Sequence, residues 1–368
     1  MVQVIRAKLC IHTLLAPQHH KLYKMQKQQY KIFSLKTHKN NWQTNKPNVC
    51  QFELTFACGL RCKHCYTDCY NNPGDIKNEL SEKQIKLILD KVYNAGVLWL
   101  CFTGGDPLAR KDFLDIYYYA KKKGFIITVF TNGYSMTRKI AEELKKYPPF
   151  VIEMTLNAAS EELYDKISQV NGSFVKVMKG IDLILKARLP LKIKTQITKD
   201  NFKDIKKIKG FIEKLGLLFR PSFDLHARLN GDLAPCNLRL SAQEILSLDG
   251  NKDFSDSGEC YSKSQEKQDR FLFRCAAGSG DGFHVDPYGN TFICNLLRKP
   301  AFNLLKFDIE YMRNKLLPLV RQMKFTTDSK CRVCNLINSC RLCPGRAYVE
   351  TGNKESHVQY YCELTKII

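Results

Sequence analysis

The sequence lacks any long, uninterrupted apolar run. No stretch approaches the ~20 consecutive apolar residues that a membrane-spanning helix requires. The apolar stretch near the N-terminus is broken by Arg6, Lys8 and His12, so the chain also lacks the continuous hydrophobic region of a secretory signal. These absences argue against a membrane or exported protein and predict a cytoplasmic location.

Acidic residues are missing from the first 52 positions, which hold nine Lys or Arg of a chain with a net charge of +22. A basic arm of this kind, residues 1–48, is typical of segments that bind nucleic acid or an acidic peptide, and also of segments that bind no specific partner. The rest of the chain is also rich in Lys, Ile and Asn, so a general bias in composition explains the charge without a polyanion. Nucleic acid is therefore the less favoured partner.

Cysteine, in contrast, is abundant, with 16 in 368 residues. Disulfide-rich scaffolds are usually short and secreted, whereas this chain is long enough for two domains and has no export signal. Several of the cysteines form CxxC pairs, which in an intracellular enzyme are typical of bound metal. We therefore expect reduced, metal-loaded thiols, a chemistry that favours an anoxic cell.

The cysteines Cys58, Cys62 and Cys65 are the most informative group. A [4Fe-4S] cube needs four ligands, and a tight triplet on one loop supplies three, which leaves one iron open to a small molecule. A zinc half-site or buried thiols are the competing interpretations. Cys69 lies close by, but as a fourth ligand it would close that iron, so we treat it as a bystander.

A second motif, Gly104-Gly105-Asp106-Pro107, follows the next apolar run. Together the cysteine spacing, with His64 before the third cysteine, and this motif resemble the CxxxCxΦC loop and the GGEP motif of the radical S-adenosylmethionine (radical SAM) superfamily. The resemblance implies that the amino and carboxylate groups of SAM occupy the open iron and that the glycine motif receives the amino group. Asp106 stands where Glu is commoner and is one methylene shorter.

Apolar and helical patterns alternate from residue 49 to about residue 225. The expected strands follow the pattern of repeated βα units, and Ser81 with Gln84 forms a capping box that starts the first helix. The six expected strands are Val49 to Phe56, Val97 to Phe102, Phe125 to Phe130, Phe150 to Leu156, Leu191 to Ile197 and Leu217 to Leu225. This count matches the open, TIM-like (β/α)6 partial barrel of the radical SAM family, with the cofactor at the C-terminal ends of the strands.

Residues 131–133 and Asn157 also follow expected strands, the third and the fourth, and so lie at the same C-terminal end of the barrel. In related enzymes the end of the fourth strand touches the SAM ribose, which makes Asn157 a candidate, along with His64, for binding the cofactor. Asn157 is equally well explained as a turn-forming amide that caps the next helix. His226, Arg220 and Asp224 lie near the end of the sixth strand, where a catalytic role and an ordinary structural role are both open.

The C-terminal region is rich in cysteine, with four of its cysteines within thirteen residues. The order Cys, Gly-x4-Cys, CxxCx5CxxC, Cys resembles the SPASM extension of radical SAM peptide-modifying enzymes, except that the last short gap has two residues instead of three. The resemblance implies two auxiliary [4Fe-4S] clusters, so three in all. By this resemblance the ligands of the outer cluster would be Cys331, Cys334, Cys340 and Cys362. Those of the inner cluster would be Cys275, Cys294 and Cys343.

The inner set lacks a fourth cysteine. Asp281 stands where some relatives have one, although a turn role within Gly280-Asp281-Gly282 is the favoured interpretation. Two CxxC pairs are also a standard zinc arrangement, but seven interleaved cysteines fit two iron clusters better. We therefore expect an α/β fold with these parts: arm 1–48, partial barrel 49–230, bridging segment 231–274 with a short helix at Ala242 to Leu248, and iron-sulfur domain 275–368.

The resemblance implies reductive cleavage of SAM to a 5′-deoxyadenosyl radical that abstracts hydrogen from a substrate. Enzymes with this extension mostly modify peptides, so a peptide or protein side chain is the first predicted substrate, and a small molecule such as a tetrapyrrole precursor is the second. The implied partners are an electron donor such as flavodoxin or ferredoxin and, because the arm is short, a separate leader-peptide-binding protein. A zinc-stabilised nucleic-acid-binding protein is the alternative outside enzymes.

Overall fold

The computed structural model describes residues 30–40, 44, 46–67, 75–249, 271–273, 282–337 and 339–367. Cys275, Asp281 and Cys69 lie outside these residues, as do Cys10, Cys260 and most of the basic arm. The predictions made for them therefore remain predictions.

The described strands form a single sheet in the order β6-β5-β4-β3-β2-β1-β7-β8-β9. Strands β1 to β6 pair in parallel, β7 joins β1 in parallel, and β8 and β9 continue antiparallel. The two edges, β6 and β9, do not pair, so the predicted partial barrel is confirmed. The strands are β1 Val49–Thr55, β2 Trp99–Gly104, β3 Ile126–Thr131, β4 Val151–Thr155, β5 Leu191–Gln196, β6 Pro221–Ser222, β7 Gly282–Val285, β8 Asn290–Phe292 and β9 Phe302–Asn303.

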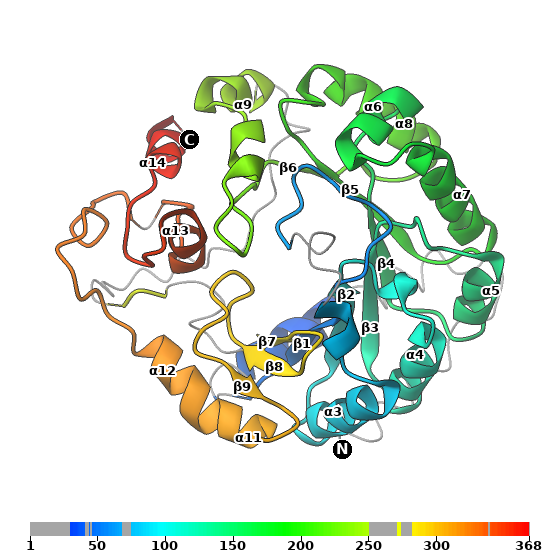
Figure 1. Ribbon diagram of the computed structural model, residues 1–368, viewed down its shortest axis with the longest axis horizontal. Coiled ribbons are helices and arrows are strands. Elements are labelled where there is room, and N and C mark those ends of the chain that lie inside the picture. Colours follow the sequence, from blue (N-terminus) through cyan, green and yellow to red (C-terminus); the bar gives the residue numbers. More distant parts are fainter. Residues whose placement is uncertain are drawn as a thin grey trace.

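Helices connect the parallel strands and lie outside them as an arc (Figure 1). The barrel helices are α3 Glu82–Asn94, α4 Phe113–Lys122, α5 Arg138–Lys146, α6 Glu161–Ser168, α7 Ser173–Lys186 and α8 Ile205–Lys214. The C-terminal part adds α9 Ala242–Asp249, α11 Ile309–Tyr311, α12 Leu317–Arg321, α13 Pro344–Thr351 and α14 Gln359–Ile367. Both hydrogen bonds of the predicted capping box are present at Ser81 and Gln84. Among the described residues, no helix has the length and apolar character needed to cross a membrane.

The two faces of the strands differ in chemistry. Cys50, Phe52 and Leu54 of β1 are fully buried in the large core that the helices cover. Each large apolar side chain buried in this way contributes about 1.5 to 3 kcal/mol. The alternate residues face the inside of the barrel, and there Glu53 is also completely buried. The inner face is therefore polar where a cofactor and substrate are expected.

The structure differs from the prediction in three places. The sixth strand is shorter than predicted and pairs with β5 only over Pro221–Ser222, at the edge of the sheet, where proline is tolerated. Helix α6 was not expected. Strands β7 to β9, from the predicted C-terminal domain, extend the barrel sheet itself.

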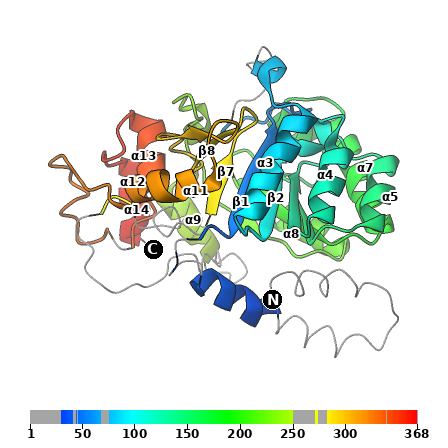
Figure 2. The same ribbon diagram turned by 90° about the horizontal axis from the view of Figure 1, so that it is seen from below.

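The residues before β1 lie at the opposite end from the strand C-termini. Residues 30–40 are helical and lie below the barrel (dark blue in Figure 2). Trp99, at the start of β2, donates a 2.8 Å hydrogen bond to the Tyr30 hydroxyl, and His38 stacks on its ring at 4.8 Å between centroids. Part of the predicted arm is thus an ordered helix.

Candidate functional site

Two loops meet at the C-terminal ends of β1 and β2. The cysteine loop follows β1, and its N–H groups at Arg61 and Lys63 donate to the carbonyl oxygens of Ser168 and Ile167 at the end of α6, at 2.9 and 3.1 Å. Within the loop the Cys65 N–H donates to the Cys62 carbonyl at 3.0 Å. The unexpected helix α6 therefore holds the cysteine loop in place.

Polar groups surround two of the three thiols of this loop. Asn132 Nδ2 lies 3.3 Å from Cys58 Sγ, and the Leu60 N–H donates to the same sulfur at 3.4 Å. The Thr67 hydroxyl lies 3.2 Å from Cys65 Sγ. Hydrogen-bond donors around sulfur stabilise the thiolate form, which is the form that binds iron. The donor set therefore fits an iron-sulfur cluster.

No group of three or more Cys, His, Asp or Glu side chains in the described residues is placed to hold one metal ion. A tetrahedral zinc site requires its ligands to converge on a single ion. A [4Fe-4S] cube does not, because each cysteine binds a different iron. The lack of a convergent single-ion site therefore does not count against the cube.

The glycine pair packs directly against the chain that leads into Cys58. The Gly105 N–H donates to the Thr55 carbonyl at 2.8 Å, and the Asp106 N–H donates to the Ala57 carbonyl at 2.9 Å. Gly104 has a φ of +133°, and a Cβ added at Gly105 would lie 2.5 Å from the Ala57 carbonyl oxygen. Only glycine fits both positions, so the motif is needed to join the two loops.

Asp106 is completely buried beneath these loops. It begins the short helix Pro107–Ala109, and Oδ1 accepts from the Thr131 hydroxyl at 2.7 Å and the Leu108 N–H at 3.2 Å. Burial raises the pKa of Asp106 to about 6, although hydrogen bonds from Thr131, Leu108 and Ser135 act to lower it. Oδ2 makes no hydrogen bond of good geometry within the described part of the chain. A buried carboxylate oxygen of this kind suits an ammonium group, and the residues therefore fit the amino end of SAM.

His64 and Asn157, the two further residues predicted to bind the cofactor, lie beside each other. Asn157 Nδ2 is 3.3 Å from His64 Nε2, and Asn157 Oδ1 accepts the Gln196 N–H of β5 at 2.9 Å. Asn157 does not cap the next helix, because Ser160 holds that position. Burial lowers the pKa of His64 to about 4, with Asp200 opposing the shift, so the imidazole is neutral at pH 7.

Four of the C-terminal cysteines lie close together, because three of the thiols act on the pKa of the fourth. Burial raises the pKa of Cys331, and the neighbouring thiols of Cys362, Cys340 and Cys334 raise it further. A similar effect on Cys362 comes from burial and then from Cys340 and Cys334. These are the four residues predicted as the outer auxiliary set.

Two of the three predicted inner residues also meet. Cys343 is the N-cap of α13, and its Sγ accepts the Arg346 N–H at 3.5 Å. A Cβ added at Gly345, in the first turn of that helix, would lie 3.0 Å from Cys294 Sγ. The sulfur of Cys294 also accepts the Leu297 N–H at 3.4 Å. The loop after β8 and the start of α13 therefore bring Cys294 and Cys343 to the same place.

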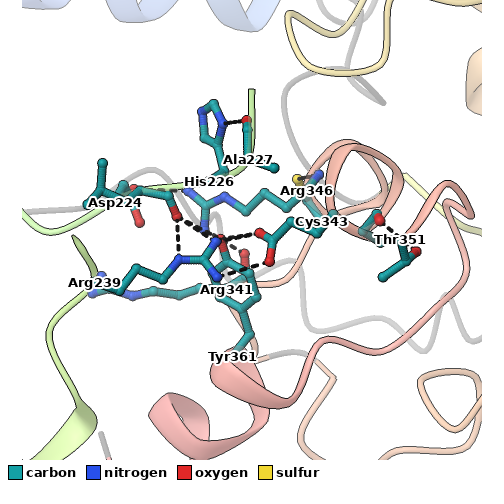
Figure 3. A network of polar contacts seen from close by, with 12 residues as sticks. Asp224, His226, Ala227, Arg239, Arg341, Cys343, Arg346, Thr351 and Tyr361 are labelled. Atoms are coloured by element: carbon teal, nitrogen blue, oxygen red, sulfur yellow. Dashed lines mark hydrogen bonds and ion pairs between the residues drawn. The ribbon is translucent and has the colours of Figure 1, made fainter. Parts of the chain in front are cut away.

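A polar network joins the end of the barrel to the C-terminal helices (Figure 3). Arg239 forms a buried bidentate pair with Glu350 of α13 and donates to the Leu225 carbonyl, and Asp224 binds Arg346 at 3.0 Å. His226 donates from Nδ1 to the carbonyl of Ala227 at 2.9 Å. Asp224 thus has a structural partner, and Arg220 is exposed.

The structure also contains a buried charge pair that was not predicted. Glu53, in the centre of β1, accepts two hydrogen bonds from Arg298 at 2.8 and 2.7 Å, and the guanidinium lies 4.8 Å from the centre of the Phe292 ring. Arg298 also donates to the carbonyl of Asn295, in the loop that holds Cys294. The pair therefore connects the first barrel strand to a candidate cluster loop. A lone Glu within an apolar strand was the only signal of it in the sequence.

Comparison with known proteins finds a family model that matches the part of the chain containing this site. The model of the Radical SAM superfamily matches residues 52–212, which include both motifs. An AdoMet-dependent heme synthase of Methanosarcina barkeri is 25% identical over 84% of this chain and 95% of its own length. The subtilosin biosynthesis protein AlbA of Bacillus subtilis is 28% identical over 45% of this chain and 36% of its own. AlbA and six other curated relatives are each matched over only 36% to 44% of their own length.

Solved structures share the fold. Streptococcus suis SuiB bound to its precursor peptide SuiA superposes with a TM-score of 0.65 and 15% identity, over 96% of this chain and 84% of SuiB. At this identity the likeness concerns the fold alone, and it includes the C-terminal part.

Proposed function

We propose that this chain is a radical SAM enzyme, because the model of that superfamily matches residues 52–212, and that Cys58, Cys62 and Cys65 hold a [4Fe-4S] cluster that binds SAM. The observation that carries the proposal is the joining of the cysteine loop to Asp106, a buried carboxylate whose Oδ2 has no hydrogen-bond partner of good geometry in the described residues. When bound, the cluster and SAM supply a 5′-deoxyadenosyl radical, which abstracts hydrogen from the substrate.

The chain's own residues would bind and orient the cofactor. Asp106 accepts the ammonium group of SAM, and Gly104 and Gly105 allow the backbone to approach closely. Asn132 would orient the Cys58 sulfur through its side-chain N–H. His64 remains neutral and fixes Asn157 at the end of β4.

We further propose two auxiliary [4Fe-4S] clusters in a SPASM-like C-terminal region. Cys331, Cys334, Cys340 and Cys362 would hold the outer one, and Cys294, Cys343 and Cys275 the inner one. Their closeness supports both sets, except for Cys275, which lies outside the described residues. These clusters would accept an electron from the substrate or bind it. An electron donor such as flavodoxin or ferredoxin would reduce the enzyme.

For the substrate, we propose a haem-related tetrapyrrole. The supporting observation is that the match to the heme synthase of M. barkeri covers 84% of this chain and 95% of that protein, and so extends beyond the barrel. The matches to peptide maturases cover less than half of this chain, so they say little about the substrate. The sequence alone predicted a peptide as the first candidate substrate and a tetrapyrrole precursor as the second, so this proposal reverses that order.

A peptide substrate is the second candidate. The fold of SuiB, which was solved with a precursor peptide, extends over 96% of this chain, and AlbA belongs to bacteriocin biosynthesis. Recognition of such a peptide would then involve a separate leader-peptide-binding protein.

Iron analysis tests the cluster assignments. Anaerobically reconstituted wild type should contain ~12 iron atoms, and the Cys58→Ala/Cys62→Ala/Cys65→Ala variant ~8, since each cube carries four. Cys236→Ala is the matched control and should keep all of them, because Cys236 lies outside the three sets. A colourless, zinc-containing protein would contradict the assignment.

Product analysis tests the activity. Reduced wild type with SAM and iron-coproporphyrin III should form 5′-deoxyadenosine and a porphyrin of altered mass, and the triple variant neither. Unchanged porphyrin, together with 5′-deoxyadenosine formation that depends on an added peptide, would favour the second candidate. No 5′-deoxyadenosine under any condition would overturn the proposed activity.

A further inference from the structure

A large cleft lies at the end of the barrel opposite to the cysteine loop. Its volume is about 2040 Å³, and it is lined by the loops that enter β2, β3, β4 and β5 and by the helix at residues 30–40. These loops precede the strands, so they lie at the N-terminal ends of the parallel sheet. The helix that forms one wall is visible below the barrel in Figure 2. The proposed chemistry, at the other end of the same strands, does not use this cleft.

The lining of the cleft is strongly basic. It includes eight Lys or Arg side chains and two acidic ones, a net charge of +6. Five of the cations come from the loops after α4, α5 and α7 or from the ends of those helices: Lys121, Lys122, Lys145, Lys146 and Arg188. The two acidic residues of the lining are Asp308 and Glu310.

Helix dipoles account for part of this pattern. Helices α3, α4, α5 and α7 all end at the cleft, and the C-terminus of a helix carries about half a negative charge that favours a nearby cation. Four such ends offset about two of the six positive charges. Lys146 is also paired with Glu143 at 2.7 Å. A net charge of about +3 therefore remains, more than helix capping requires.

The aromatic side chains of the cleft contact one another. The rings of Tyr30 and Phe150 lie 5.0 Å apart, and those of Tyr118 and Tyr147 lie 5.4 Å apart. Proteins that bind single-stranded nucleic acid instead present ring faces on which bases stack. The aromatic groups here form apolar walls between cations. Such walls suit a peptide that carries both acidic and apolar side chains.

The sequence of residues 1–29, with five Lys or Arg and no acidic residue, offers no charge complementary to the cleft. From the charge and the apolar walls, we propose that this cleft binds an acidic peptide segment of another protein. The interaction is independent of SAM and of the clusters, so it goes beyond the proposed activity and can fail separately from it.

Binding of model peptides to the full-length, reconstituted protein tests the proposal. The probes are a short fluorescein-labelled peptide of repeated Glu-Glu-Leu units, its Gln-Gln-Leu counterpart and an oligothymidylate of equal charge, each followed by fluorescence anisotropy. The acidic peptide should bind, more weakly as salt is added, and the neutral peptide should not. The variant Lys122→Gln/Lys145→Gln/Arg188→Gln should bind it about tenfold more weakly, because three exposed ion pairs are each worth a few-fold in affinity.

The matched control is Lys83→Gln/Lys206→Gln/Lys214→Gln, which removes three equally exposed cations outside the cleft. It should lose less than about twofold in affinity. Equal losses in the two variants would overturn the proposal, because binding would then follow the net charge of the molecule. Tighter binding of the oligothymidylate, with the same sensitivity to the cleft variant, would overturn it in favour of nucleic acid.

Discussion

The buried pair of Glu53 and Arg298 gives the sharpest prediction for stability. Replacing Arg298 by Met keeps most of the side-chain volume over the Phe292 ring but removes both hydrogen bonds to a carboxylate that is 0% exposed. A buried charge that loses its partner costs about 3 to 5 kcal/mol. At roughly 2 to 3 °C per kcal/mol for a chain of this size, the apparent melting temperature should fall by about 10 °C at pH 7.

The loss should depend on pH. Burial already raises the pKa of Glu53, and Arg298 opposes that rise, so the variant raises the pKa further. A carboxyl whose pKa is raised by folding is more stable in the folded state when protonated, and its cost grows as pH rises through the folded-state pKa. The deficit of Arg298→Met relative to wild type should therefore be smaller near pH 5 than at pH 7.

A double-mutant cycle separates the pair from its surroundings. Glu53→Gln/Arg298→Met buries no charge, so it should be less destabilised than the sum of the single variants by more than about 0.5 kcal/mol. Thermal unfolding followed by circular dichroism under anaerobic conditions measures all four proteins, and iron analysis checks that the clusters are retained. Additive effects, or a melting temperature within about 1 °C of wild type for Arg298→Met, would refute the reasoning.

Three further outcomes follow from the site. Asp106→Asn should weaken SAM binding about 30-fold in equilibrium dialysis, because a charge-assisted hydrogen bond is lost. The affinity of the wild type for SAM should fall as the pH drops below about 6, where the Asp106 carboxyl protonates. Gly105→Ala should lower the iron content, because its Cβ would lie 2.5 Å from the Ala57 carbonyl oxygen, whereas Gly210→Ala, with open space around it, should not. Arg239→Met leaves its buried carboxylate partner on α13 unpaired and should cost about 3 kcal/mol in unfolding, while Arg239→Lys should recover part of it.

Much of the barrel could be predicted from local patterns. In strands β1 to β5 and most of the helices between them, the spacing of apolar residues along the sequence already indicates the element, and tertiary packing agrees with it. Because parallel strands point the same way, the loops after β1 and β2 had to meet, and the structure confirms that Cys58 and Gly105 lie on joined segments. These are short-range properties of the chain.

The remainder depends on distant contacts. Helix α6 has only eight residues, and just two of its apolar side chains, Tyr164 and Ile167, are buried, so its period is too weak to detect. Arg298 is 245 residues from Glu53, and no local pattern indicates that the two meet. Strand β7 pairs with β1 across a similar separation. Such features depend on tertiary contacts between distant segments, which the pattern of one segment does not indicate.

The chemistry of the two ends of the barrel follows from one property of the fold. In a parallel βα sheet every helix begins near the strand C-termini and ends near the strand N-termini, so the positive ends of the helix dipoles gather at one side and the negative ends at the other. The positive side favours anionic groups, and there the chain places its cysteine loop and Asp106. The negative side favours cations, and there the chain places Lys121 and Lys145. The cysteine site therefore uses the field of the fold directly, whereas the basic cleft carries more charge than that field balances, and this excess is the reason to expect a partner there.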